Sequence, residues 1–281
     1  MLKSWLSLKK NPVDLLIEKF SILLKDNSKI RKGFEDPEKS KFLSFALRSL
    51  VELHNFRETH VGIYLVSAET FVKKMNHDVQ RSKYRSLYQS ENPFDDQFYE
   101  LVRLGYVSLY HKFETFLNEV PSQVDNLSSS KYPDISVSNF LKTRLNFSIK
   151  DVKNYHPRIQ KINWICNCAK HYDGFPLKKD PPEQFSNCHS SVRIRIEKQE
   201  LQSDVEFLMD YYSHLISLFI FMGIMNTIFM NKEQTKFGSG EAVIDVEALA
   251  LELSRAILVS MKDMNNDAMM AAGAKISASF T

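Results

Sequence analysis

The sequence is poor in residues that break helices or cross-link chains: only 8 glycines, 9 prolines and 3 cysteines occur among 281 residues. Few glycines and prolines favour long, uninterrupted helices. Three cysteines cannot form a disulfide framework, so a reducing, cytoplasmic setting is expected. The opening residues, MLKSWLSLKKNPVD, also lack an apolar core long enough for a secretory signal.

A strong excess of charge of one sign is also absent, since the formal net charge at pH 7 is +3. This balance neither requires nor excludes a nucleic acid, and a basic binding surface would have to be local. Long apolar runs are missing as well. The longest, Leu215–Met230, has 16 residues, fewer than the ~20 of a bilayer-spanning helix. A buried helix is therefore preferred, and a membrane-associated protein that uses this run is kept as an alternative.

Apolar residues recur at helical spacing along most of the chain. A helix expected to begin at Pro37 should bury an apolar stripe that continues past Gly62 to Phe71. Another helix is expected to end at Val120, because proline follows it at Pro121.

A change of pattern follows later in the chain. Ser191–Glu197, SVRIRIE, alternates strictly between apolar and polar residues and predicts a short strand. Ser203 and Glu206 then form a capping-box pattern, which predicts the start of a helix over Asp204–Met230.

The stretch Arg158–Lys179, RIQKINWICNCAKHYDGFPLKK, is the centre of the functional prediction. Most of it fits one helix that Asp173 and Gly174 should end. Asn167 and His171 are four residues apart and lie about 40° apart around such a helix. A polar pair is therefore expected on the last turn, beside a basic loop. An ordinary capped helix end is the alternative interpretation.

Three segments carry a resemblance to a known family: KFETFLNEV at Lys112–Val120, SNFLKTRL at Ser138–Leu145 and INWICNCAKHYDG at Ile162–Gly174. In this order they resemble the HEPN superfamily of helical, nucleic-acid-associated domains. The resemblance implies an all-α protein, a HEPN-like helical bundle with one short strand or hairpin. It would occupy residues 94–231, with helical extensions at 1–93 and 232–281, and would form a homodimer.

Ribonuclease members of the superfamily carry an Arg, usually followed by a polar residue such as Asn, then three to five more residues and a His. Here Asn167 and His171 match, whereas Cys166 occupies the Arg position. The resemblance implies that His171 acts as acid or base and that Asn167 assists it. Glu114, on the helix that the family packs against the His helix, and Cys166 would support this pair. The resemblance also implies cleavage that needs no metal ion.

A thiol cannot supply the cation that phosphodiester cleavage needs. Arg158 lies about 20 Å from His171 along the helix axis, too far to replace the missing Arg within one subunit. Other basic residues of this stretch, of the following strand or of a second subunit would have to supply the charge or bind phosphate. Solvated surface positions are the alternative interpretation. The candidates are Lys170, Lys178, Lys179, Arg193 and Arg195.

A zinc site is an alternative interpretation, because Cys168 and His171 share a helix face. The remaining ligands would have to be Cys188 and His189, which are adjacent in sequence, and this spacing matches no standard zinc site. Buried thiols are preferred, and no metal or cofactor is expected.

These observations leave three hypotheses. The first is a HEPN-like protein of the toxin–antitoxin or anti-phage defence type that binds RNA, a nucleotide or a protein partner and has an incomplete ribonuclease motif. A protein partner would bind through the N- or C-terminal helices. The second is an active endoribonuclease whose cation comes from elsewhere, and the third is the membrane-associated protein. Whether the chain is an enzyme stays open at this point.

Overall fold

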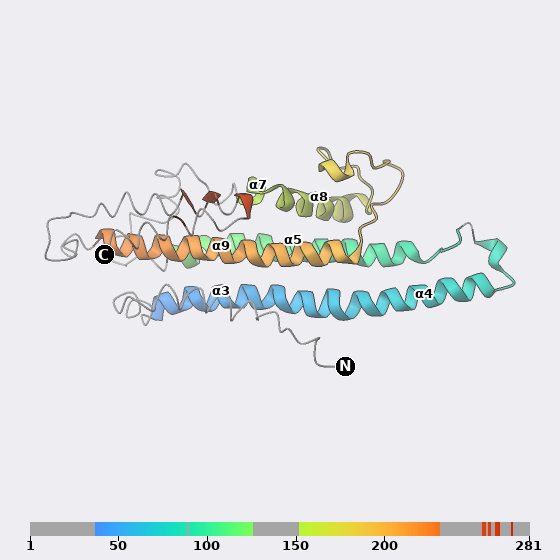
Figure 1. The fold of residues 1–281 in the computed structure, drawn as a ribbon, viewed down its shortest axis with the longest axis horizontal. Coiled ribbons are helices and arrows are strands. Elements are labelled where there is room, and N and C mark those ends of the chain that lie inside the picture. The colour runs from blue at the N-terminus through green and yellow to red at the C-terminus, as the bar shows by residue number, and fades with distance from the viewer. Residues whose placement is uncertain are drawn as a thin grey trace. The chain divides into compact units, whose positions relative to one another are not determined.

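The structure, a computed structural model, describes residues 37–88, 90–125 and 152–230 and a few positions between 255 and 271. The fold is all-α, as the sequence predicts: the described residues form helices and no strand. The main elements follow one another along the chain (Figure 1). They are α3 (Pro37–Phe56), the π-helix η1 (Arg57–Tyr64), α4 (Leu65–Arg81), η2 (Arg85–Leu87), α5 (Asp95–Asp125), α7 (Val152–Tyr155), α8 (Pro157–Tyr172), η4 (Glu183–Phe185) and α9 (Lys198–Met230).

These residues divide into two compact units, and α3, α5 and α9 each contribute to both. In the first unit, which includes the described residues 37–51, 116–125 and 209–230, aromatic rings form the core. Phe116 stacks on Phe45, with ring centroids 5.5 Å apart, and on Tyr212 at 4.0 Å. An exposed ion pair of 2.8 Å joins Arg48 to Glu119. Such stacking of buried rings contributes more to stability than an exposed ion pair of this kind does.

The second unit comprises Glu52–Thr115 and Lys153–Leu208 and contains the stretch with Asn167 and His171. Within it, η1 changes the expected apolar stripe. Its i→i+5 hydrogen bonds make wider turns than those of an α-helix, which rotates the following residues about the helix axis. Val61 and Leu65 are consequently buried, whereas Ile63 and Phe71 are 57% and 59% exposed. The helix continues past Gly62 as expected, but the prediction that Phe71 lies on the buried stripe is wrong.

Two helix boundaries also differ from the sequence-based expectation. Helix α5 continues through Pro121 to Asp125, because proline removes one main-chain donor without always ending a helix. Helix α9 begins at Lys198, so Ser203 lies inside the helix and does not cap it. The hydroxyl of Ser203 accepts a hydrogen bond from the guanidinium of Arg158 instead.

The segment Ser191–Glu197 begins with a turn at Ser191 and forms no strand. The backbone N–H of Ile194 donates to the carbonyl of Gly174 at 2.8 Å, and one such bond does not make a ladder. Ile194 and Ile196 are buried, as the alternation predicts, whereas Val192 is 53% exposed. Packing of two isoleucines therefore explains the pattern that suggested a strand.

Some expectations lie outside the described residues or are not tested by the structure. The short helix expected at Ser138–Leu145 belongs to the part that the structure does not describe. The boundaries of the predicted domain at residues 94–231 stay a prediction. Leu215–Met230 forms the end of α9, and no helix in the described part of the chain is both long enough and apolar enough to cross a membrane.

Candidate functional site

Helix α8 carries the residues that the sequence singled out. At its start, Nδ1 of His156 accepts a hydrogen bond of 3.0 Å from the backbone N–H of Arg158. At its end, Asp173 adopts the left-handed conformation with φ of 52°, and the N–H of Gly174 donates to the carbonyl of Cys168 at 3.0 Å. These bonds satisfy backbone groups that a helix end leaves unpaired. The predicted helix and its end at Asp173 and Gly174 are confirmed.

The last turn of α8 presents three exposed side chains, Lys170, His171 and Tyr172. Asn167 lies one turn earlier and is half-buried. Its Nδ2 donates to the carbonyl oxygen of Asn163 at 2.7 Å and to the Oδ1 of Asn163 at 2.5 Å. The amide N–H groups of Asn167 are thus directed back along the helix. His171 is presented to solvent without a hydrogen bond from this amide.

Cys166, which occupies the Arg position of the ribonuclease pattern, is 2% exposed. Burial raises the pKa of its thiol to about 11, with Lys170 and Lys178 lowering that pKa and Glu114 raising it. The thiol is therefore neutral at pH 7. Burial, Glu114 and Cys166 together raise the pKa of Tyr110 to about 12. The charges of Glu114, Lys170 and Lys178 therefore act on the thiol at the Arg position, and that thiol in turn acts on Tyr110.

Sequence reasoning selected Glu114 and the lysines but missed Tyr110. Tyr110 is four residues before Glu114, so the two side chains lie on the same face of α5. That spacing is the signal from which Tyr110 could have been found.

The loop after α8 is held against the helix. The indole Nε1 of Trp164 donates to the carbonyl of Lys178 at 3.1 Å, and the indole ring stacks on Phe185 with centroids 5.2 Å apart. Burial lowers the pKa of the Lys178 ammonium group. Lys179, the next residue, is exposed. The loop therefore holds one partly desolvated lysine near Cys166 and a second lysine in solvent.

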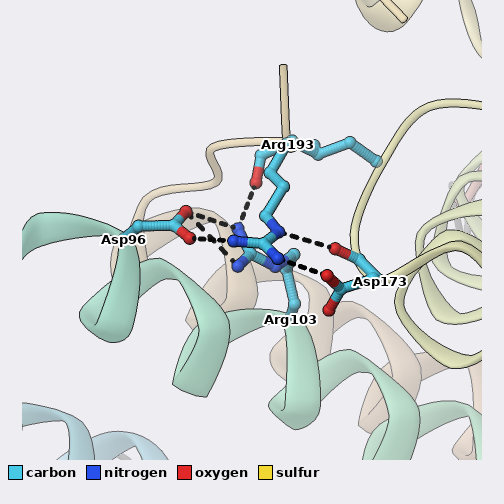
Figure 2. Close-up of polar contacts among 5 residues, drawn as sticks. Asp96, Arg103, Asp173 and Arg193 are labelled. Atoms are coloured by element: carbon cyan, nitrogen blue, oxygen red, sulfur yellow. Dashed lines mark hydrogen bonds and ion pairs between the residues drawn. The ribbon is translucent and has the colours of Figure 1, made fainter. Parts of the chain in front are cut away.

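Arg193 is engaged by two carboxylates (Figure 2). Its Nη1 contacts Oδ2 of Asp96 at 2.9 Å, its Nε donates to the backbone carbonyl of Asp173 at 3.0 Å, and its Nη2 contacts the Asp173 carboxylate. These hydrogen bonds raise the pKa of Arg193. Arg195, two residues later, places its guanidinium 5.6 Å from the ring centroid of Tyr99. Arg193 is thus committed to holding the end of α8.

Arg103 supports this arrangement from α5 (Figure 2). Its side chain is 4% exposed. Nη1 donates to the carbonyl of Ile194 at 2.9 Å, and both Nη atoms lie 3.4 Å from Oδ1 of Asp96. A Cβ at Gly174 would lie only 2.6 Å from Nε of Arg103, so the backbone passes directly over the guanidinium. We call Asp96, Arg103, Asp173 and Arg193 the arginine clamp.

A second group of charges is more deeply buried. Asp204 is fully buried. Its carboxylate oxygens lie 2.5 Å from Nε of Arg158 and 2.6 Å from Nζ of Lys161, and they accept a hydrogen bond of 2.6 Å from the hydroxyl of Tyr106. Burial and the Asp204 charge raise the pKa of Tyr106. These bonds connect α5, α8 and α9 within one unit. Arg158 is therefore engaged in the core contacts of this unit, consistent with its predicted distance from His171.

Sequence reasoning missed this buried group. Asp204 lies three residues after Leu201 and four before Leu208, both buried, so its place on an apolar face was a visible signal.

Metal ligands do not gather in the described part of the chain. None of its groups of three or more His, Cys, Asp or Glu residues could hold a metal ion. Cys168 is buried, whereas Cys188 and His189 are exposed. The Nδ1 of His189 and the hydroxyl of Ser191 are hydrogen-bonded at 2.6 Å.

No protein family, curated protein or solved structure matches the chain. The resemblance to the HEPN superfamily therefore stays a prediction based on the sequence INWICNCAKHYDG and the order of the helices around it.

Proposed function

We propose that the chain is a HEPN-like protein that binds RNA through the last turn of α8 and the loop after it, without cleaving it efficiently. One observation carries this proposal. A buried, neutral thiol, Cys166, occupies the position of the catalytic Arg, while Lys170 and His171 stay exposed on the next turn. In this proposal the exposed groups bind phosphate, and no arginine occupies the Arg position to stabilise the transition state of cleavage.

The chemistry of phosphodiester cleavage supports this distinction. Charge develops on the phosphate oxygens in the transition state, and a fixed cation must lie beside them. A thiol with a pKa of about 11 is uncharged at neutral pH and cannot do this. Binding requires only that cations contact the backbone phosphates, and exposed lysines such as Lys170 and Lys179 provide such contacts.

The proposal includes the assembly and setting that the family resemblance implies. Two copies would pair so that their α8 ends line one groove, and the protein would belong to a toxin–antitoxin or anti-phage defence system. Light scattering of the purified chain, with and without RNA, tests the pairing. A monomer at all concentrations would remove the homodimer from the proposal but leave the RNA contacts in place.

RNA binding is tested by fluorescence anisotropy with a labelled single-stranded RNA over a range of salt concentrations. Lys170→Gln should weaken binding and reduce the slope of log K against log [salt] by about 0.7, the effect of losing one phosphate contact. His171→Gln should also weaken binding, because His171 is exposed on the same turn as Lys170. Lys74→Gln, which removes an exposed lysine of α4, is the matched control. Equal affinities for Lys170→Gln, His171→Gln and Lys74→Gln would contradict the proposal.

An active endoribonuclease is the second candidate, and Lys178 is the observation that favours it. Its ammonium group is partly desolvated and interacts electrostatically with Cys166, so its charge lies near the Arg position. Purified protein is incubated with structured RNA in the presence of a chelator. Cleavage that persists with chelator and is lost in both His171→Ala and Lys178→Gln supports the enzyme. No cleavage by the wild type at high concentration, together with RNA binding, supports the first function.

A further inference from the structure

The end of α8 is fixed in space by contacts from distant parts of the chain. Asp173 follows His171 by two residues and is held through both its carboxylate and its backbone carbonyl by Arg193. Arg193 in turn contacts Asp96 on α5, and the same carboxylate contacts the buried Arg103 (Figure 2). The last turn of α8 therefore has its direction set from α5.

We propose that Asp173 and Arg193 are positioning residues for the RNA-binding end of α8. Their bridge fixes the direction in which Lys170 and His171 are presented to the RNA backbone, although neither bridging residue contacts RNA. This inference rests on the proposed function. It adds a mechanism by which Asp173 and Arg193, which are far apart in sequence, together affect the affinity for RNA.

The Arg193 and Asp173 side chains are too exposed for their ion pair to contribute much to folding, so a positioning role can be distinguished from a stabilising one. The Arg193 side chain is 37% exposed and that of Asp173 is 70% exposed, and ion pairs at such positions contribute little to folding. Arg103 is buried and packs against Gly174. These contacts do not involve the Asp173 carboxylate, so they should persist when the ion pair between Asp173 and Arg193 is lost. Loss of the bridge should release the helix end and leave the rest of the unit folded.

The decisive variant is Asp173→Asn, because charge and position act on RNA affinity in opposite directions. Removal of a negative charge beside a phosphate-binding surface strengthens RNA binding if the charge acts alone. Loss of the bridge weakens RNA binding if Asp173 positions the helix end. Asparagine tolerates the left-handed backbone of residue 173. We expect binding about three- to tenfold weaker, within the range for residues that act on a site from outside it.

Asp180→Asn is the matched control. Asp180 is also exposed, lies in the same loop and has a positive φ of 56°, but it is outside the arginine clamp. It should bind RNA as tightly as the wild type or slightly more tightly. Weaker binding by Asp180→Asn to the same extent would show that any aspartate of this loop matters, and the positioning role would be wrong.

Arg193→Gln and the double variant Arg193→Gln/Asp173→Asn complete the test. If the two residues act through one bridge, the double variant binds about as weakly as Arg193→Gln alone. Melting temperatures measured in parallel should stay close to that of the wild type. Wild-type or tighter RNA binding by Asp173→Asn, or additive losses in the double variant, would overturn the positioning role.

The proposed function and this inference fail in different ways. If Lys170→Gln and His171→Gln bind RNA like the wild type, the proposed function is wrong and the positioning role falls with it. If those two variants lose affinity while Asp173→Asn does not, RNA binding stands and only the positioning role is wrong.

Discussion

Replacement of Asp204 by asparagine tests the most deeply buried charges of the described residues. The carboxylate is fully buried. Its Oδ2 contacts Nζ of Lys161 and accepts a hydrogen bond from the hydroxyl of Tyr106, and its Oδ1 accepts a hydrogen bond from Nε of Arg158. Asparagine keeps the shape of the side chain but replaces one oxygen with an NH₂ group. In either orientation of the amide, its N–H groups face a cation that previously faced a carboxylate oxygen.

The expected loss follows from this geometry. Removal of one partner from a buried ion pair costs about 3–5 kcal/mol when the other charge is left unpaired. Lys161 keeps a contact of 3.2 Å with Glu200, and the Arg158 side chain is 32% exposed, so we expect the lower end of that range, about 3 kcal/mol. For a chain of this size, that corresponds to a fall of about 6–12 °C in melting temperature. Asp78→Asn makes the same chemical change at an exposed position on α4, where the side chain is 58% exposed. Its effect should stay below about 0.5 kcal/mol.

Urea unfolding followed by tryptophan fluorescence is the assay. The chain has two tryptophans, and in a Trp5→Phe background the buried Trp164 reports on the unit that contains Asp204. A loss for Asp204→Asn that equals the loss for Asp78→Asn would refute the reasoning. It would show that the desolvation of these charges cancels their mutual attraction and that the group does not stabilise the unit.

Gly174→Ala should destabilise by about 1–3 kcal/mol in urea, because φ is +81° and the new Cβ would lie 2.6 Å from Nε of Arg103. An unchanged midpoint would contradict this close approach. Stability should fall as pH rises from 9 to about 11, because the folded state holds the thiol proton of Cys166 that the unfolded state loses. Cys166→Ala should reduce that fall, and an identical pH profile would be the contrary result. Burial lowers the pKa of His60, so its contribution to stability is lost as pH falls below 6.5. His60→Gln should lose less stability than the wild type between pH 6.5 and 5, as measured by melting.

Local sequence chemistry explains what could be predicted around the site. The end of α8 follows from Asp173 and Gly174, because left-handed residues terminate a helix whatever packs around them. The exposure of His171 on the last turn follows from the same register. The burial of Cys166 also agrees with its place among Ile162 and Ile165, since cysteine behaves as a small apolar residue.

The contacts between distant segments could not be predicted in this way. Arg193 and Asp96 are 97 residues apart, and Tyr106 and Asp204 are 98 apart. Spacing along the chain carries no information about which charges meet across such separations. The sequence pattern accordingly predicts phosphate binding for Arg193, and only the fold brings Arg193 against Asp96 and Asp173.

By itself, the sequence determined an all-α chain and a helix that ends at Asp173 and Gly174, with His171 on its last turn. Hydrogen bonds within a helix join residues four apart, so periodicity and end residues are enough to define it. Only the tertiary structure decided which charges are compensated and which stay available for a ligand. That outcome depends on the packing of α5, α8 and α9 in one unit, which brings charged residues from distant parts of the sequence into contact. Burial removes water from between these charges, so their interaction is stronger than it would be at the surface.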